Sequence, residues 1–277
     1  MKYLLYLLFF LTAPLMAQFD EPEGDDTWSE EPPPSGTFTG SETATTRTRD
    51  KGMGLGRGAT TPVAEDARLL RARQEAEQRV ESGDQMPPEE MSGFEDALGM
   101  GYYYLDAGRD DLSGEYLAVA EAKLEYGDLD AVLSVFYLYN LLADGAKERG
   151  MEQEAEAMFE KAESVADTYL ANDPPPADAA EMHAELGWNY YDLGWYDLAA
   201  YHFHEILDWQ PEDAGNAYMV ASTLALAGRT EMALDYLAEA LELGLLDEYS
   251  VDPGQDGDLD GLRDTDAYRE LAEAYDF

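Results

Sequence analysis

Between about residues 92 and 247, apolar side chains recur every three or four positions, which is the period of an amphipathic helix. The clearest segment places Gly187, Tyr190 and Gly194 in the order small, large, glycine, and the same order recurs 34 residues later. Each closing glycine stands where a helix must end and the chain must reverse. The pattern predicts helical hairpins joined by short turns.

The second helix of each predicted hairpin also combines a small residue with a large one. Ala199 precedes Phe203 by one turn, and Ala233 precedes Leu237 by one turn. Small residues allow two helices to approach closely, and the large residues fill the space around them. Thr230 is placed to cap the last of these helices, predicted from residue 231 to residue 243. No such hairpin buries its apolar face alone, so the hairpins must stack.

Weaker copies of the pattern lie upstream. Gly101, Tyr104 and Gly108 have the spacing of the clear segment, and Ala143 and Gly150 mark another copy. The intervals are irregular, with 42 residues from Gly101 to Ala143 and 44 from Ala143 to Gly187. The extra residues are expected to lengthen helices near 128–137 and 165–172.

These motifs resemble the tetratricopeptide (TPR) family, whose repeat has this period and this order of small and aromatic positions. The resemblance implies an all-α, right-handed TPR-like solenoid of about four helical hairpins over residues 92–247. For residues 94–165, a Sel1-like repeat, which is longer, is an alternative. Residues 248–277 resemble the closing segment after a last repeat, with Leu259 and Leu262 as anchors and Thr265 or Asp266 capping a short helix.

The N-terminal residues predict a different organisation. Lys2, an apolar run and Ala17 have the order of a secretory signal peptide, residues 1–17, so we expect a periplasmic or secreted protein without stable membrane insertion. Residues 18–91 are acidic and Pro-rich and then mildly basic, and they are expected to be a disordered linker. Within them, residues 64–80 form a possible helix that docks on the first repeat. The chain has no Cys, which excludes a disulfide framework.

The formal net charge is −43 at pH 7, and the excess is uneven. Residues 83–277 carry 46 acidic and eight basic residues, whereas residues 47–82 carry eight basic and six acidic ones. Repulsion by so acidic a surface argues against nucleic acid as a partner. A saline habitat and a basic protein partner both remain open as explanations. The basic stretch 47–57 could also fold back onto the acidic repeats.

The resemblance further implies that the first helix of each hairpin lines a concave groove for an unknown protein or peptide. When the first helices are aligned with the repeat pattern, the positions that face the groove are aromatic and acidic, which suits a partner with Lys or Arg. Packing of the aromatic residues between hairpins is the competing interpretation. The expected binding residues are Leu98, Tyr102, Leu105, Asp106, Trp188, Tyr191, Asp192 and Tyr218, with a more polar contribution from Asn140, Asp144 and Lys147.

Candidate chemistry beyond protein binding is sparse. Asp256, Asp258 and Asp260 have the spacing of a calcium loop, but Ala267 stands where the loop needs a bidentate Glu. A calcium-dependent envelope module using residues 252–266 is therefore the alternative function. His202 and His204 lie two apart on a helix and cannot share a metal ion, and His183 is expected to be packed and hydrogen-bonded. We expect no cofactor, no metal and no enzymatic activity.

Overall fold

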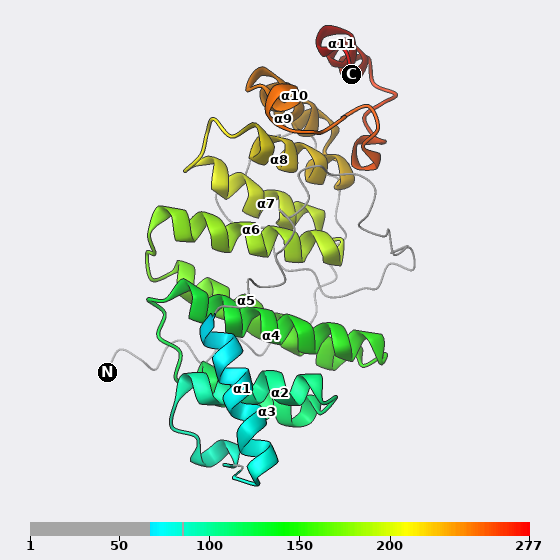
Figure 1. Ribbon diagram of the computed structural model, residues 1–277. Helices are drawn as coiled ribbons and strands as arrows, with labels where there is room; N and C mark the ends of the chain where they lie inside the picture. Colours follow the sequence, from blue (N-terminus) through cyan, green and yellow to red (C-terminus); the bar gives the residue numbers. More distant parts are fainter. Residues whose placement is uncertain (1–66, 85) are drawn as a thin grey trace, which may run out of the picture. The chain divides into compact units, whose positions relative to one another are not determined.

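Every regular element is a helix in the part of the chain that the computed structural model describes, residues 67–84 and 86–277 (Figure 1). The predicted signal peptide and most of the predicted linker lie outside the described residues. The elements are α1 (Ala67–Ser82), η3 (Pro88–Glu90), α2 (Phe94–Asp106), α3 (Asp110–Glu121), α4 (Leu129–Glu148), α5 (Glu152–Leu170), α6 (Pro176–Leu193), α7 (Tyr196–Leu207), α8 (Ala214–Leu226), α9 (Thr230–Glu242), α10 (Leu245–Glu248), η4 (Gly257–Leu259) and α11 (Asp266–Tyr275).

The helices pack in sequential antiparallel pairs. α2 packs with α3, α4 with α5, α6 with α7, and α8 with α9, and α1 packs on α2. The all-α class and the helix pairing predicted from the sequence are confirmed. The expected helix at 64–80 corresponds to α1, and the long helices α4 and α5 account for the irregular intervals. Among the described helices, none has the length and apolar character needed to cross a membrane.

Each of these four pairs turns at a glycine with a positive φ. The φ angles lie between 68° and 78°, in the left-handed region that glycine enters without a Cβ clash. In each turn, the N–H after the glycine donates to a carbonyl five residues earlier, as in a Schellman motif. The four glycines are Gly108, Gly150, Gly194 and Gly228.

The predicted contact between small and large residues is present inside the α6·α7 pair. A Cβ built on Gly187 would lie 2.7 Å from the Phe203 ring, and Phe203 is only 1% exposed. The glycine therefore allows α6 to approach the ring closely, and a larger residue would force the two helices apart. Gly101 has the equivalent role in α2, where an added Cβ would meet Leu138 of α4 at 3.0 Å.

Two predicted caps have different outcomes. Thr265 is the N-cap of α11, and its side chain accepts a hydrogen bond from the Tyr268 amide. The prediction that Thr230 caps α9 was wrong, because Arg229 occupies the N-cap position and makes no side-chain cap bond. Leu259 and Leu262 are fully buried, so the C-terminal segment does anchor on the preceding helices as expected.

Candidate functional site

The predicted binding face of the first helix pair is covered by α1. Leu98 and Tyr102 of α2 are 4% and 6% exposed, and Leu105 is half-buried. Their cover is the face of α1 that carries Ala72 and Ala76, both buried. The helix-forming residues of this segment, Ala, Leu, Arg, Glu and Gln, make it a helix, and its alanines let it lie close to α2.

The approach of α1 to α2 is a backbone contact. A Cβ built on Gly99 would lie 2.5 Å from the carbonyl oxygen of Ala72 and 3.0 Å from its Cβ. Real atoms do not tolerate such a distance, so any side chain at position 99 would lift α1 from its seat. We call the α2 surface formed by Asp96, Gly99, Tyr102 and Asp106 the α1 seat.

Two arginines of α1 hold it on the seat. Arg73 lies over the Tyr102 ring, with its guanidinium carbon 5.8 Å from the ring centroid, and forms an ion pair with Asp106. Arg79 donates to Asp96 at 2.8 Å. The cation–π and ion-pair contacts expected for a basic partner are thus made by the chain itself.

Tyr102 also connects α2 to α4. Its hydroxyl donates to the carbonyl oxygen of Ser134 at 3.0 Å. Burial raises the pKa of Tyr102, so the phenol remains neutral and keeps the proton that it donates to the Ser134 carbonyl oxygen. The ring is therefore fixed from α4 while its face is presented to α1.

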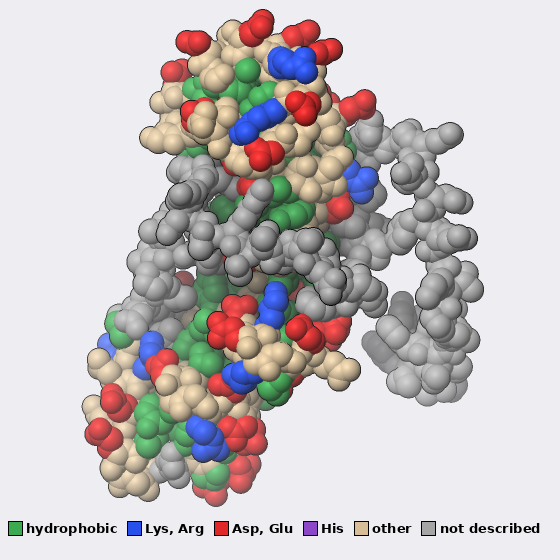
Figure 2. Space-filling view, turned by 90° about the vertical axis from the view of Figure 1, so that its right-hand side faces the viewer, with side chains coloured by type: hydrophobic (Ala, Val, Ile, Leu, Met, Phe, Trp, Pro, Cys, Tyr) green, Lys and Arg blue, Asp and Glu red, His purple; other side chains and the backbone are tan. Residues whose placement is uncertain are grey.

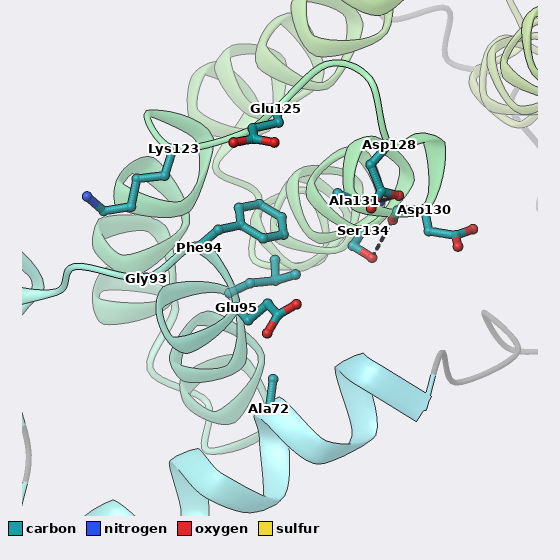
Figure 3. A pocket seen from close by; sticks show the side chains of 11 residues that line it. Ala72, Gly93, Phe94, Glu95, Lys123, Glu125, Asp128, Asp130, Ala131 and Ser134 are labelled. Carbon is teal, nitrogen blue, oxygen red and sulfur yellow. Dashed lines mark hydrogen bonds between the residues drawn. The ribbon is translucent and has the colours of Figure 1, made fainter. Parts of the chain in front are cut away.

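A pocket of about 320 Å³ adjoins the α1 seat. Figure 3 shows the Phe94 ring pointing into it and the Lys123 ammonium pointing away from it. The described lining comes from Ala72 of α1, the start of α2, the α3–α4 connection and the start of α4. It includes four carboxylates: Glu95, Glu125, Asp128 and Asp130. The pocket therefore combines an apolar floor with an acidic rim.

The predicted faces of α4 and α6 are neighbours. The Asn189 amide donates to Asn140 at 3.4 Å. The pKa of Asp144 is raised, first because surrounding protein displaces water from it and also because Asp192 lies nearby, although Lys147 acts in the opposite direction. A carboxylate whose pKa is raised by burial and by a neighbouring carboxylate gains from a cationic group beside it.

Trp188 belongs partly to the core and partly to the surface. Its ring is half-buried and packs edge-on against Phe203 at 5.3 Å and against Tyr191 at 5.7 Å, both measured between ring centroids. Asp192, one turn further along α6, is exposed. The contact with Phe203 shows that part of the ring packs inside the α6·α7 pair, and partner binding by the rest of the ring stays a prediction.

The predicted faces of α6 and α8 are joined by the C-terminal segment. The Tyr218 hydroxyl donates to Asp256 at 2.6 Å, and the Tyr191 hydroxyl donates to Asp258 at 2.6 Å. Tyr218 is 0% and Asp256 is 2% exposed. Burial raises the pKa of Tyr218, and the carboxylate beside it acts in the same direction. A neutral phenol and a buried carboxylate form a strong hydrogen bond.

The carboxylates of the expected calcium loop are engaged by protein donors. Asp256 also accepts from the Asp258 amide at 3.0 Å, and Arg263 forms an ion pair with Asp260 at 2.6 Å. Arg263 also donates to the Asp256 carbonyl oxygen at 2.8 Å. Within residues 67–84 and 86–277, no group of three or more His, Asp or Glu residues is arranged to hold a metal ion.

His183, which is half-buried, and His202, which is buried, form a pair that the sequence did not predict. Their Nδ1 atoms lie 3.0 Å apart, across the α6·α7 pair. Burial lowers the pKa of His183 to about 4 and that of His202 to about 3. Both rings are therefore neutral at pH 7, with one nitrogen donating to the other. The expectation that His183 is packed and hydrogen-bonded agrees with this contact.

The predicted residues thus fall into three groups. Those of α2 lie at the contact with α1. Tyr191 and Tyr218 donate to the C-terminal segment, and Trp188 and Asp192 lie on α6 beside Tyr191. The contacts that the sequence did not predict are made by the chain's own covering segments, through Arg73, Arg79, Asp256 and Asp258. Their signal in the sequence was limited to a weak apolar stripe in residues 64–80 and an Asp-rich spacing in the tail.

Comparison with protein-family models, with curated proteins and with solved structures finds no match to this chain.

Proposed function

We propose that this chain is a non-enzymatic protein-binding scaffold or adaptor of the TPR type. In this proposal the first helices α2, α4, α6 and α8 line one concave surface of a right-handed solenoid. The signal-like residues 1–17 place it in the periplasm or outside the cell. The repeated glycine turns and the small-to-large helix contacts support the repeat architecture.

One observation carries the proposal. Two of the faces that the repeat register selects hold another segment of the chain: α1 lies on α2, and the Asp-rich C-terminal segment contacts Tyr191 of α6 and Tyr218 of α8. Surfaces that bind chain segments in this way are the ones that protein-binding repeats use for partners. The middle faces, on α4 and α6, combine the half-buried Trp188 ring with Asp144 and Asp192.

The partner that fits these middle faces is a basic protein segment. A Lys or Arg side chain there gains from the two neighbouring carboxylates and from the face of the indole ring. Acidic side chains are scattered over the described parts of the face drawn in Figure 2. The general acidity steers a basic partner toward the protein, and the aromatic face fixes where it docks.

Site-specific photocrosslinking tests the proposal without a known partner. A photoreactive amino acid replaces Asp192, on the proposed surface, or Glu156 on α5 as the control. In cells that express the protein, we expect a discrete crosslinked product at position 192 that disappears when Trp188 is changed to Ala. Equal products at both positions, or a product insensitive to Trp188, would contradict the proposed surface.

A calcium titration separates the alternative function. If millimolar calcium raises the melting temperature and Asp258→Asn abolishes that rise, a calcium-dependent module of residues 252–266 replaces the proposal. An unchanged melting temperature leaves the carboxylates with the tyrosine and arginine partners described above.

A further inference from the structure

We propose that the α1 seat is a binding site for a basic partner helix and that α1 occupies it in the absence of that partner. The inference rests on the proposed function and names the partner's chemistry. The partner helix carries Ala at positions i and i+4, Arg at i+1 and Arg at i+7. These are the positions of Ala72, Ala76, Arg73 and Arg79 in α1.

Each element of that pattern has a counterpart on the seat. The first alanine must be small because the Gly99 backbone lies directly against it. The first arginine is recognised by the Tyr102 ring and Asp106, and the second by Asp96. Ala72, Ala76 and Arg79 share one helical face, at spacings of four and seven residues, and Arg73 lies at the edge of that face.

The contacts that hold α1 are of the exchangeable kind. In the Arg73–Asp106 pair, the side chains are 31% and 57% exposed, and in the Arg79–Asp96 pair they are 32% and 35% exposed. Ion pairs this open to solvent contribute little to stability and are screened by salt. Between them α1 presents the small side chains of Ala72 and Ala76, so the large apolar side chains buried at this contact are those of α2, Leu98 and Tyr102. Another helix with small residues at these positions can cover the same side chains.

The pocket beside the seat offers a further contact to a basic helix. It leaves about 320 Å³ next to Ala72, and Phe94, Leu98, Lys123 and four carboxylates are among its lining residues. A Lys or Arg one turn before the first alanine of the partner helix can place its aliphatic stem against Phe94 and its cation near the carboxylates. The chain has Arg68 at that position of α1, so this cation belongs to the same pattern.

The test compares two ways of releasing α1 in the full chain. The double variant Arg73→Glu with Arg79→Glu reverses both charges, so it breaks the two ion pairs and leaves the seat open. Gly99→Leu also lifts α1, because its side chain collides with the Ala72 backbone, but it fills the seat. Hydrogen exchange should show about tenfold faster exchange of the α1 amides in both variants, with the α4–α9 amides unchanged.

Binding of a labelled synthetic peptide of residues 67–82 then decides the proposal. The charge-reversal variant should bind it about tenfold or more tightly than the unmodified protein, whose own α1 competes at high effective concentration. Gly99→Leu should not bind it, and the peptide with both arginines changed to Glu should bind neither protein. This pattern would establish a helix site that α1 normally occupies.

Several results would overturn the proposal. Binding of the peptide to Gly99→Leu would show that it attaches elsewhere on the acidic surface. Absence of binding to a charge-reversal variant with exposed α1 amides would show that the seat does not accept a helix in trans. If α1 remains protected in that variant, the arginines are not the recognition elements. Dimers that exchange α1 would assign the seat to a second copy of this chain. None of these results bears on crosslinking at position 192.

Discussion

The chain covers its α2 face with a basic helix and its α6 and α8 faces with an acidic tail, and the two covers are held by different forces. Arg73 and Arg79 reach the α1 seat through exposed ion pairs. In contrast, Asp256 meets Tyr218 in a buried hydrogen bond between a carboxylate and a neutral phenol. The first kind of contact is screened by salt and easily exchanged, and the second is costly to leave unmade.

The difference indicates separate roles for the two covers. The tail buries Leu259, Leu262 and Tyr268 in addition to its hydrogen bonds, so it completes the fold. α1 contributes the small side chains of Ala72 and Ala76 to its contact with α2, so we expect the fold to depend on it less than on the tail. A scaffold that keeps one cover fixed and the other exchangeable retains its stability when a partner binds.

The largest expected effect comes from removal of the tail. Deletion of residues 252–277 exposes the apolar surface under three buried side chains, each contributing about 1.5–3 kcal/mol. The free energy of unfolding should fall by about 5 kcal/mol, and the truncated protein should associate through the exposed patch. Thermal unfolding and sedimentation measure the two effects.

The control for the truncation is Asp264→Ser, a change at an exposed position of the same segment. It should melt close to the unmodified protein. A truncated protein that remains monomeric and melts at the same temperature as the full chain would show that the tail does not cap the fold.

A smaller effect is expected from single hydroxyl deletions under the tail. Tyr218→Phe leaves an oxygen of the buried Asp256 carboxylate without its donor, which should cost about 1.5–3 kcal/mol. Tyr191→Phe should cost about 1 kcal/mol or less, because Asp258 is only half-buried. Chemical denaturation of both variants measures the difference.

A double-mutant cycle with Asp256→Asn tests whether the cost belongs to this hydrogen bond. A coupling energy of about 1 kcal/mol or more between positions 218 and 256 is expected. If the two substitutions are additive, the tail is held by its apolar side chains alone.

Features that depend on neighbouring residues could be predicted from the sequence, whereas contacts between residues far apart in the chain could not. The glycine turns were predictable because a left-handed residue after a helix is a local requirement, as at Gly194 and Gly228. The docking of α1 was predictable in outline from its apolar stripe. The contact between Tyr191 and Asp258 was not, since it joins residues 67 positions apart with no local signature. The spacing of the tail aspartates indicated a cation instead of tyrosine hydroxyls.

The His183–His202 pair was missed for the same reason. Its members lie 19 residues apart on two helices, and only the packing of α6 on α7 brings their Nδ1 atoms together. Sequence reasoning compared His202 with His204, its near neighbour, and had no means of finding the partner across the hairpin.

The histidine pair makes the stability of the folded protein depend on pH. Its pKa values in the folded state, about 4 for His183 and about 3 for His202, lie below the ordinary value of 6.5. The unfolded chain therefore binds more protons, and the stability that the neutral pair contributes above about pH 6.5 is lost as the pH falls toward 4. Carboxylates with raised pKa values, such as Glu181 and Glu205, act in the opposite direction.

Replacement of one histidine isolates that contribution. Between about pH 7 and about pH 4, the unmodified protein should lose on the order of 1–3 kcal/mol more stability than His202→Gln does. Gln retains hydrogen-bonding capacity but does not titrate. Parallel pH profiles for the two proteins, measured by chemical denaturation, would rule out a titrating pair. His204→Gln is the comparison: burial lowers the pKa of His204 as well, so this variant should show a separate change of the same sign that does not depend on the pair.

The smallest effect, and the most direct test of the comparison between the covers, is that of salt. About 1 M NaCl should weaken the two exposed α1 ion pairs by about 1 kcal/mol in total, which corresponds to about fivefold faster exchange of α1 amides. The same salt screens repulsion within a chain of net charge −43, so the rest of the fold should become more stable. The buried bond between Tyr218 and Asp256 should be insensitive to salt.

Faster exchange of the α1 amides in salt, without faster exchange of the tail amides, would show that α1 is held by electrostatic contacts and the tail by buried ones. Arg73→Ala with Arg79→Ala should abolish the salt response of α1, whereas equal responses of α1 and the tail would show that one mechanism holds both.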